Sequence, residues 1–266
     1  MSVENNRWTD EFYQLGAFLY NEPNHIYRQK MRPGSMVQFY RAMANLQRIE
    51  SPLNHLFNVM LHLLPQRLKR ELLSCFLESS EAAFETPLAF FNDVHRELDI
   101  NPDNPFIHPD TVLRSAEAHI CLESKVLPST MLKLSQLYKY LRFLGHWRAK
   151  ANARARPYLL FLTKKPLAAQ WVAQERTEIF LGNDPIADLT AYLRRHDLPP
   201  EGRPQIELVL PELKLGAATW SEIGQFLAQE LERLRNGAPS DLQEILETLL
   251  GDFLAELAQR QLWQPA

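Results

Sequence analysis

The chain has 266 residues, with 29 Lys and Arg against 32 Asp and Glu, and so a formal net charge of −3. Apolar residues make up 45% of it and aromatic residues 10%, values that exclude a disordered, collagen-like or coiled-coil protein as a description of the whole. Only 9 residues are Gly while 18 are Pro, which leaves little material for phosphate-binding loops or a large β-sheet.

The N-terminal part of the chain, about residues 1–155, is expected to form a multi-helix bundle. Apolar residues recur there at helical spacing, and several of the segments begin at a Ser, Thr or Pro, which is typical of a helix start. The expected helices span residues 5–20, 35–49, 51–64, 65–77, 86–98, 110–120 and 128–155.

The pattern changes after Pro157. Three short apolar runs bounded by Gly, Pro or Asn predict β-strands, at residues 158–163, 177–181 and 205–210. The segments between them, 166–174 and 185–196, have helical character. Residues 157–215 are therefore expected to form a small α/β patch with about three short strands.

Two amphipathic helices are expected at the end of the chain, at about 219–235 and 240–262, separated by the break at 236–239. The apolar stripe of the second helix runs from Leu242 to Leu257 and is wide enough to need a cover. It predicts either an antiparallel hairpin with the preceding helix or a face that docks a second copy or a partner. The fold class is thus mostly α, with a helical domain at 1–156 and a second domain at 157–266.

Charge is distributed unevenly along the chain. Residues 124–174 hold ten basic residues and no acidic one, whereas residues 71–123 hold eleven acidic residues and only two basic ones. Charge blocks of opposite sign indicate surfaces and partners rather than a fold.

The basic helix at 128–155 carries a leucine stripe that faces the core, with aromatic and cationic residues along its edge. Such an edge suits an anionic partner, an acidic protein surface or a nucleic acid, because aromatic rings stack on bases and cations neutralise phosphates. Internal pairing with the acidic block 71–123 and a plain solvated face are the second and third explanations of the pattern. The predicted partner-binding residues are Lys139, Tyr140, Arg142, Phe143, Trp147, Arg148, Lys150, Arg154 and Arg156.

Known catalytic and cofactor motifs are absent from the sequence. No glycine-rich phosphate loop and no serine elbow occurs, and neither cysteine directly adjoins a histidine. The histidines lack the spacing of a metal site: His55 and His62 are seven residues apart, and His119 and Cys121 would point to different faces of a helix. The expectation is that the protein has no catalytic residues, no metal and no cofactor.

One weak alternative is a metal-dependent phosphodiesterase. Glu212 and Lys214 follow the predicted strand 205–210, and an acid with a lysine two residues later is a minimal pattern for holding Mg²⁺ and steadying the attacking water. Asp184 or Asp188 would supply the second acid. Pro211 interrupts the strand at this point, which favours a solvated turn instead.

Taken together, these patterns predict a non-catalytic binding or adaptor protein whose basic helix engages an anionic partner. A nucleic-acid-binding protein is the second hypothesis and the phosphodiesterase the third. No apolar run approaches the roughly 18 residues that a membrane span needs. The first residues show no secretory signal, so Cys75 and Cys121 are expected to be buried free thiols in the cytoplasm.

Overall fold

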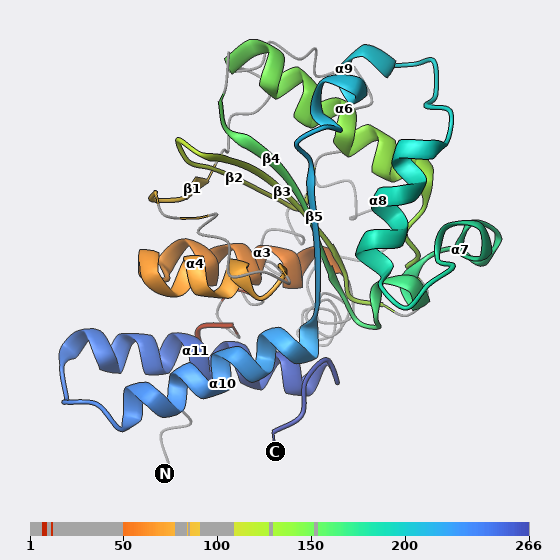
Figure 1. Cartoon of the computed structure of the whole chain (residues 1–266). Helices are drawn as coiled ribbons and strands as arrows, with labels where there is room; N and C mark the ends of the chain where they lie inside the picture. The colour runs from red at the N-terminus through yellow and green to blue at the C-terminus, as the bar shows by residue number, and fades with distance from the viewer. Residues whose placement is uncertain are drawn as a thin grey trace, which may run out of the picture. The chain divides into compact units, whose positions relative to one another are not determined.

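The structure is a computed structural model that describes residues 7–9, 12, 50–77, 84, 86–90, 109–127, 130–151 and 154–265 (Figure 1). The helices are α3 (Glu50–Leu63), α4 (Gln66–Ser74), α6 (Leu134–Ala151), the 3-10 helix η2 (Leu167–Gln170), α7 (Ala173–Ile179), α8 (Pro185–Arg195), α9 (Arg203–Val209), α10 (Trp220–Arg235) and α11 (Asp241–Gln259). The strands are β1 (Ala89–Phe90), β2 (Thr111–Arg114), β3 (Ala118–Lys125), β4 (Arg156–Thr163) and β5 (Lys214–Thr219).

The chain divides into two compact units. The terminal unit comprises residues 1–64 and 224–266, and the sheet unit comprises residues 65–223. The boundary predicted at 156/157 falls inside the sheet unit, at the start of β4. Of the predicted helices 5–20, 35–49 and 86–98, most residues lie outside the part of the chain that the structure describes.

The predicted fold class is wrong, because the sheet unit contains a five-stranded mixed sheet in the order β1-β2-β3-β4-β5. The pairs β1–β2 and β2–β3 are antiparallel, whereas the pairs β3–β4 and β4–β5 are parallel. Three of these strands lie in the region predicted to be a helical bundle. β3 is buried along nearly its whole length, although His119, Glu123, Ser124 and Lys125 make half of its sequence polar. Apolar spacing over segments as short as β2 and β3 does not separate a strand from a helix.

Of the three predicted strands, only the one at 158–163 is confirmed, as part of β4. Residues 177–179 form the last part of helix α7, and 180–181 follow it. Residues 205–209 belong to helix α9, and residue 210 follows it. Helix α9 begins after Gly202, whose φ of 76° lies in the left-handed region. Its buried residues Ile206 and Val209 are three apart, and this helical spacing was concealed by a short β-branched run.

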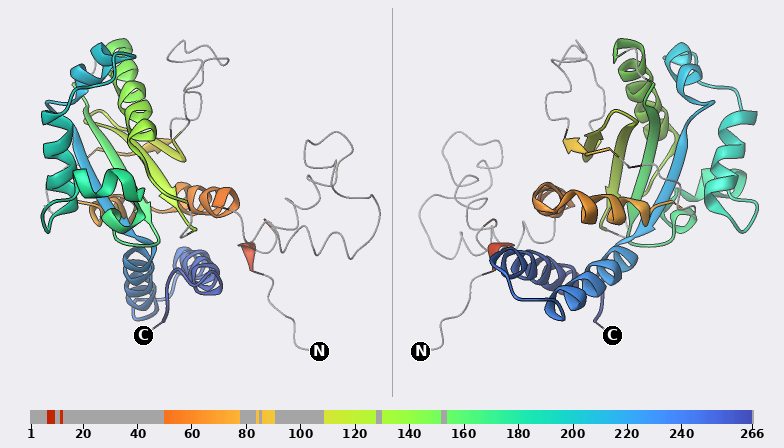
Figure 2. Two further views of the ribbon diagram at one scale, coloured as in Figure 1. Left: turned by 90° about the vertical axis from the view of Figure 1, so that its right-hand side faces the viewer. Right: turned by 60° about the vertical axis from the view of Figure 1, so that its left-hand side comes forward.

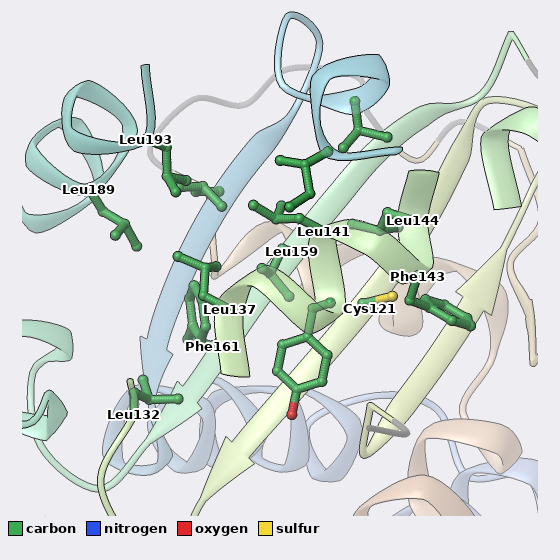
Figure 3. Packing of buried hydrophobic residues seen from close by; sticks show 14 of the residues in the cluster. Cys121, Leu132, Leu137, Leu141, Phe143, Leu144, Leu159, Phe161, Leu189 and Leu193 are labelled. Carbon is green, nitrogen blue, oxygen red and sulfur yellow. The ribbon is translucent and has the colours of Figure 1, made fainter. Parts of the chain in front are cut away.

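Helix α6 packs on one face of the sheet and forms the main described core of the sheet unit (Figure 3). Leu137 and Leu141 of α6 meet Leu159 and Phe161 of β4 in this core. Leu189 of α8 joins the same cluster, and α8 lies beside the edge strand β5 (Figure 2). The leucine stripe of the basic helix therefore faces the core, as the sequence predicts.

In the terminal unit, α10 and α11 run antiparallel. Gly224 near the start of α10 lies against Trp263 beyond the end of α11, and Arg235 at the end of α10 is 3.8 Å from Glu247. Helix α11 also contacts α3. The wide stripe of α11 is buried from Leu246 onward.

The first apolar positions of α11 are exposed: Leu242 is 60% exposed and Ile245 64%. Docking of a partner or second copy on helix 240–262 stays a prediction. Cys121 is a buried free thiol as expected, but Cys75, also free, is exposed. Within the described residues, no helix combines the length and the apolar character required to cross a membrane.

Candidate active site

One end of the sheet gathers polar side chains from different strands. Because β2 is antiparallel to β3, the residue that precedes β2 lies beside the carboxyl end of β3. Thr111 pairs with Leu122, and continuing this register by one residue sets Asp110 opposite Glu123. Asp110 Oδ2 accepts a hydrogen bond of 2.8 Å from the backbone N–H of Ser124, which holds it at that position. Residues opposite each other in an antiparallel pair have Cβ atoms about 5 Å apart, so two carboxylates adjoin here.

Lys125 lies next to the two carboxylates of Asp110 and Glu123. Successive residues of a strand point to opposite faces, so His119, Cys121, Glu123 and Lys125 lie on the same face of β3, the one that α6 covers. The ammonium group of Lys125 donates a hydrogen bond to Oε1 of Glu123. The prediction that His119 and Cys121 point to different faces was wrong, because it assumed a helix.

The first two turns of α6 hold the carboxylate of Glu123 in place. Gln136 Nε2 donates to its Oε1, and the hydroxyl of Tyr140 donates to its Oε2. Gln136 also donates to the Tyr140 hydroxyl at 2.8 Å. Gln136 and Tyr140 are four residues apart and therefore lie on one face of the helix. Both carboxylate oxygens of Glu123 thus have fixed donors.

Burial changes the acid–base behaviour of this group. Glu123 is only 3% exposed, and burial, with the charge of Asp110 as the next cause, raises its pKa to about 7; Lys125 and the Tyr140 hydrogen bond oppose the shift. Burial and the charge of Glu123 also raise the pKa of Tyr140, so its hydroxyl remains a donor. A buried acid beside a second acid, with a strongly shifted pKa, is a feature that active sites share with structural ion-pair networks.

The donor set fits a hard divalent cation. Mg²⁺ prefers oxygen ligands, is commonly held by one or two carboxylates, and keeps several of its waters. A cation between Asp110 and Glu123 would relieve the repulsion by Asp110, which after burial is the second cause of the raised pKa of Glu123. The described part of the chain contains no cluster of three or more His, Cys, Asp or Glu side chains suited to a metal ion. Among the described side chains, Asp110 and Glu123 would therefore be the two carboxylate ligands of such a cation.

The predicted partner-binding aromatics lie inside the protein. Tyr140 and Phe143 are each 1% exposed and Trp147 is 2% exposed. Tyr140 bonds Glu123, and the ring of Trp147 stacks on His119 at 3.9 Å. These three rings are therefore not available to stack on the bases of an external partner.

Two predicted partner-binding arginines form ion pairs within the chain. Arg142 bonds Glu201 at 2.6 Å, and Arg148 bonds Glu212 at 2.7 Å. Arg142 and Arg148 therefore pair with acids of the segment 201–212, and Lys125 pairs with Glu123 of the acidic block 71–123. The remaining predicted positions, all at least partly exposed, are Lys139, Lys150, Arg154 and Arg156. Partner binding by this helix stays a prediction.

Glu212 and Lys214, the residues of the alternative phosphodiesterase hypothesis, do not follow a strand as expected. Glu212 lies in a turn after α9 with a side chain that is 51% exposed, and its hydrogen bond with Arg148 lowers its pKa. Lys214 is the first residue of β5. Both suggested partner acids are engaged near the start of α8: Asp184 accepts from the N–H of Ile186 and of Ala187, and Asp188 accepts from the N–H of Gly182.

The acid–x–lysine pattern that the sequence analysis identified at 212–214 also occurs at 123–125. Glu123-Ser124-Lys125 has the same acid–x–lysine spacing as 212–214, and Asp110 stands 13 residues before Glu123. The pattern was missed because residues 110–120 were predicted to be helical. The apolar runs 111–113 and 118–122, separated by a short polar turn, were the available signal of two antiparallel strands.

His119 gives a first testable consequence of burial in this unit. Burial, with Arg114 and Arg148 as further causes, lowers its pKa to about 4. Between pH 6.5 and 4, His119 is therefore protonated in the unfolded chain but remains neutral in the folded protein, so the stability of the fold falls as the pH falls. A His119→Phe variant keeps the stack on Trp147 and should lose up to about 3 kcal/mol less on going from pH 7 to pH 4.

Denaturant unfolding of both proteins at the two pH values measures this difference. An equal loss in the wild type and the variant would show that His119 does not contribute to the acid sensitivity.

Comparison with known proteins adds no assignment: no protein-family model matches the chain, no curated protein matches it, and no solved structure matches it.

Proposed function

We propose that this protein is a metal-dependent phosphodiesterase that cleaves nucleic acid at the sheet end where Asp110, Glu123 and Lys125 meet. The observation that carries the proposal is the register of β2 and β3, which sets the two acids opposite each other with the lysine two residues further along. Two adjoining carboxylates and an ammonium group can support metal-assisted hydrolysis of a phosphodiester.

Each side chain has a role that follows from its chemistry. Asp110 and Glu123 would hold the cation, which supplies Lewis acidity and a water of lowered pKa when it is bound. Lys125 would stabilise the negative charge that develops on the phosphoryl oxygens as water attacks and the ester oxygen leaves. Tyr140 and Gln136 act as positioning residues, because they orient the carboxylate of Glu123.

The surrounding charge supports a polyanionic substrate. Lys125 pairs in register with Thr163 at the end of β4, so Lys164 and Lys165 continue the chain from this same end of the sheet. Lys133 immediately precedes α6, whose first turns hold Glu123. All of these lysines belong to the block 124–174, which has no acidic residue. Cations that are spread around a site bind successive phosphates of a nucleic acid.

The proposal is tested with the purified full-length chain and labelled single-stranded and duplex DNA and RNA. Cleavage is expected with Mg²⁺ or Mn²⁺ and not with EDTA. An Asp110→Asn variant should cleave at least ~100-fold more slowly, because it loses a charged ligand of the cation. Glu212→Gln is the matched control, since it removes an acid that also precedes a lysine by two residues, and it should retain activity.

Three results would count against this site. Failure of the wild type to cleave any of the four substrates with either metal would remove the proposal and leave the adaptor hypothesis. Equal rates for the wild type and Asp110→Asn would exclude the acid pair as the centre. Loss of activity in Glu212→Gln, with Asp110→Asn active, would move the centre to 212–214.

A further inference from the structure

A second feature of the sheet unit is a cavity of about 680 Å³ at the other end of the parallel strands. Arg156 and Lys214, the first residues of β4 and β5, line it. Helix α8, which lies beside β5 in Figure 2, contributes Ile186, Thr190 and Arg194 at four-residue spacing, so they come from one helix face. The length of β4, roughly 23 Å at 3.3 Å per residue, separates this cavity from the acid pair.

The charge of the cavity is positive. Arg156, Arg194 and Lys214 line it, against the single acid Glu212. The carboxylate of Glu212 already accepts a hydrogen bond from Arg148, and Arg156 helps to lower its pKa. The cavity therefore has an excess of positive charge that suits an anionic ligand, and two of its cations are arginines, whose planar guanidinium groups bind phosphate oxygens in pairs.

The edge of β5 adds a backbone donor on the same side. Ala217 N–H points away from β4 and donates to the carbonyl of Phe76 at 3.0 Å. Leu215 is two residues earlier, so its N–H points to the same side of the strand, and Leu215 lines the cavity. Backbone N–H groups at the edge of a sheet can donate hydrogen bonds to the oxygens of a bound phosphate.

Apolar residues complete the lining. Phe76, Leu77, Leu213 and Leu215 contribute carbon surface beside the three cations. A volume of about 680 Å³ lies in the usual range for pockets that hold a small molecule. The segment 76–77, which meets the free edge of β5 through the Ala217–Phe76 hydrogen bond, and helix α8 both line the cavity. These features favour a compact ligand with a phosphate group and a flat apolar part over an extended strand.

We propose that this cavity binds a free nucleotide, with Arg156, Arg194 and Lys214 on its phosphates and the base against the apolar lining. The site is distinct from the acid pair and does not depend on the proposed phosphodiesterase activity.

The test uses the full-length chain and the fluorescent probe mant-ADP in EDTA, so that no metal-dependent cleavage takes place. The anisotropy of the probe is expected to rise with a micromolar Kd. The double variant Arg156→Ala/Arg194→Ala should bind at least ~100-fold more weakly, because each lost charged hydrogen bond reduces affinity by about tenfold or more. Arg195→Ala is the matched control, since it removes the neighbouring exposed cation of α8 that does not line the cavity. Circular dichroism and the Tm of each variant show that it is folded.

Competition separates the possible ligands. Unlabelled ADP and AMP should displace the probe, whereas adenosine should displace it at least ~100-fold less well, because it has no phosphate. No binding up to 1 mM protein, undiminished binding by the folded double variant, or equal displacement by adenosine would each overturn the proposal. Binding of a single-stranded oligonucleotide that requires Arg194, with no binding of ADP, would overturn it in favour of a strand-binding groove.

Discussion

Replacing Glu123 by glutamine is expected to abolish metal-dependent cleavage and, at the same time, to stabilise the metal-free protein. The neutral amide cannot hold a divalent cation as the carboxylate does, so cleavage should fall by at least ~1,000-fold, equivalent to about 4 kcal/mol of transition-state stabilisation. The amide also removes a buried negative charge that lies opposite Asp110. The same substitution therefore has opposite effects on activity and on stability.

The sign of the stability effect follows from the pKa of Glu123. Its value of about 7 in the folded protein lies above the ordinary value of 4.5, so the folded state binds the proton more tightly than the unfolded chain does. The resulting stability is fully present below pH 4.5 and is lost as the pH rises to 7. At pH 8 in EDTA the variant should be more stable than the wild type by up to about 3 kcal/mol, roughly 5–10 °C in Tm, and the difference should decrease toward pH 4.5.

Thermal unfolding in EDTA at pH 4.5, 6 and 8 measures this dependence, and addition of Mg²⁺ provides the internal control. The cation should raise the Tm of the wild type and leave that of Glu123→Gln unchanged, since a ligand of the native state stabilises it only where it binds. A variant that is less stable than the wild type at pH 8 would show that the hydrogen bonds of Glu123 with Lys125, Gln136 and Tyr140 serve the fold alone.

Substitution of Gly145 by alanine should produce the largest loss of stability from a single methyl group. An alanine Cβ at this position would lie 2.2 Å from the carbonyl oxygen of Gln205, which is a backbone atom of α9. Helix α9 would have to move away from α6, and the core residues Ile206 and Val209 would move with it. The expected loss is about 2–3 kcal/mol, larger than the ~1 kcal/mol that alanine contributes through helix propensity.

Gly251→Ala is the matched control for this prediction. Gly251 also lies within a helix, α11, but a Cβ there would meet no atom within 4 Å. This substitution should raise the free energy of unfolding by about 0.5–1 kcal/mol. Denaturant unfolding of both variants compares the same chemical change with and without the close contact. Equal effects at the two positions would contradict the close packing of α9 on α6.

Local patterns identified much of the helical structure. Segments 51–64, 65–77, 185–196, 219–235 and 240–262 are helical in the structure to within a few residues, because their apolar residues recur at helical spacing and Ser240 and Asp184 cap the helices that follow them. The leucine stripe of α6 was also evident, since one face of a helix on a sheet must be apolar.

The sheet and the candidate site could not be read in the same way. Strands β2 and β3 are short and buried on both faces, so polar residues of β3 such as His119 and Glu123 lie inside the protein rather than on a solvent-facing side. β5 contains Gly216 at a place where the Phe76 carbonyl lies too close for a side chain. Tyr140 and Trp147 look like surface aromatics in sequence, yet Glu123 and His119 of β3 are their partners.

The sequence by itself determined the positions of most described helices, the acid-free block 124–174 and the presence of two acid–x–lysine patterns, at 123–125 and 212–214. Which of two such patterns has a second acid beside it was decided only by the tertiary structure. The register of β2 on β3 brings Asp110 to Glu123 across 13 residues of chain, whereas Glu212 meets the cation Arg148 instead. The physical reason is that strand pairing depends on contacts between distant segments, which local propensity and periodicity do not encode.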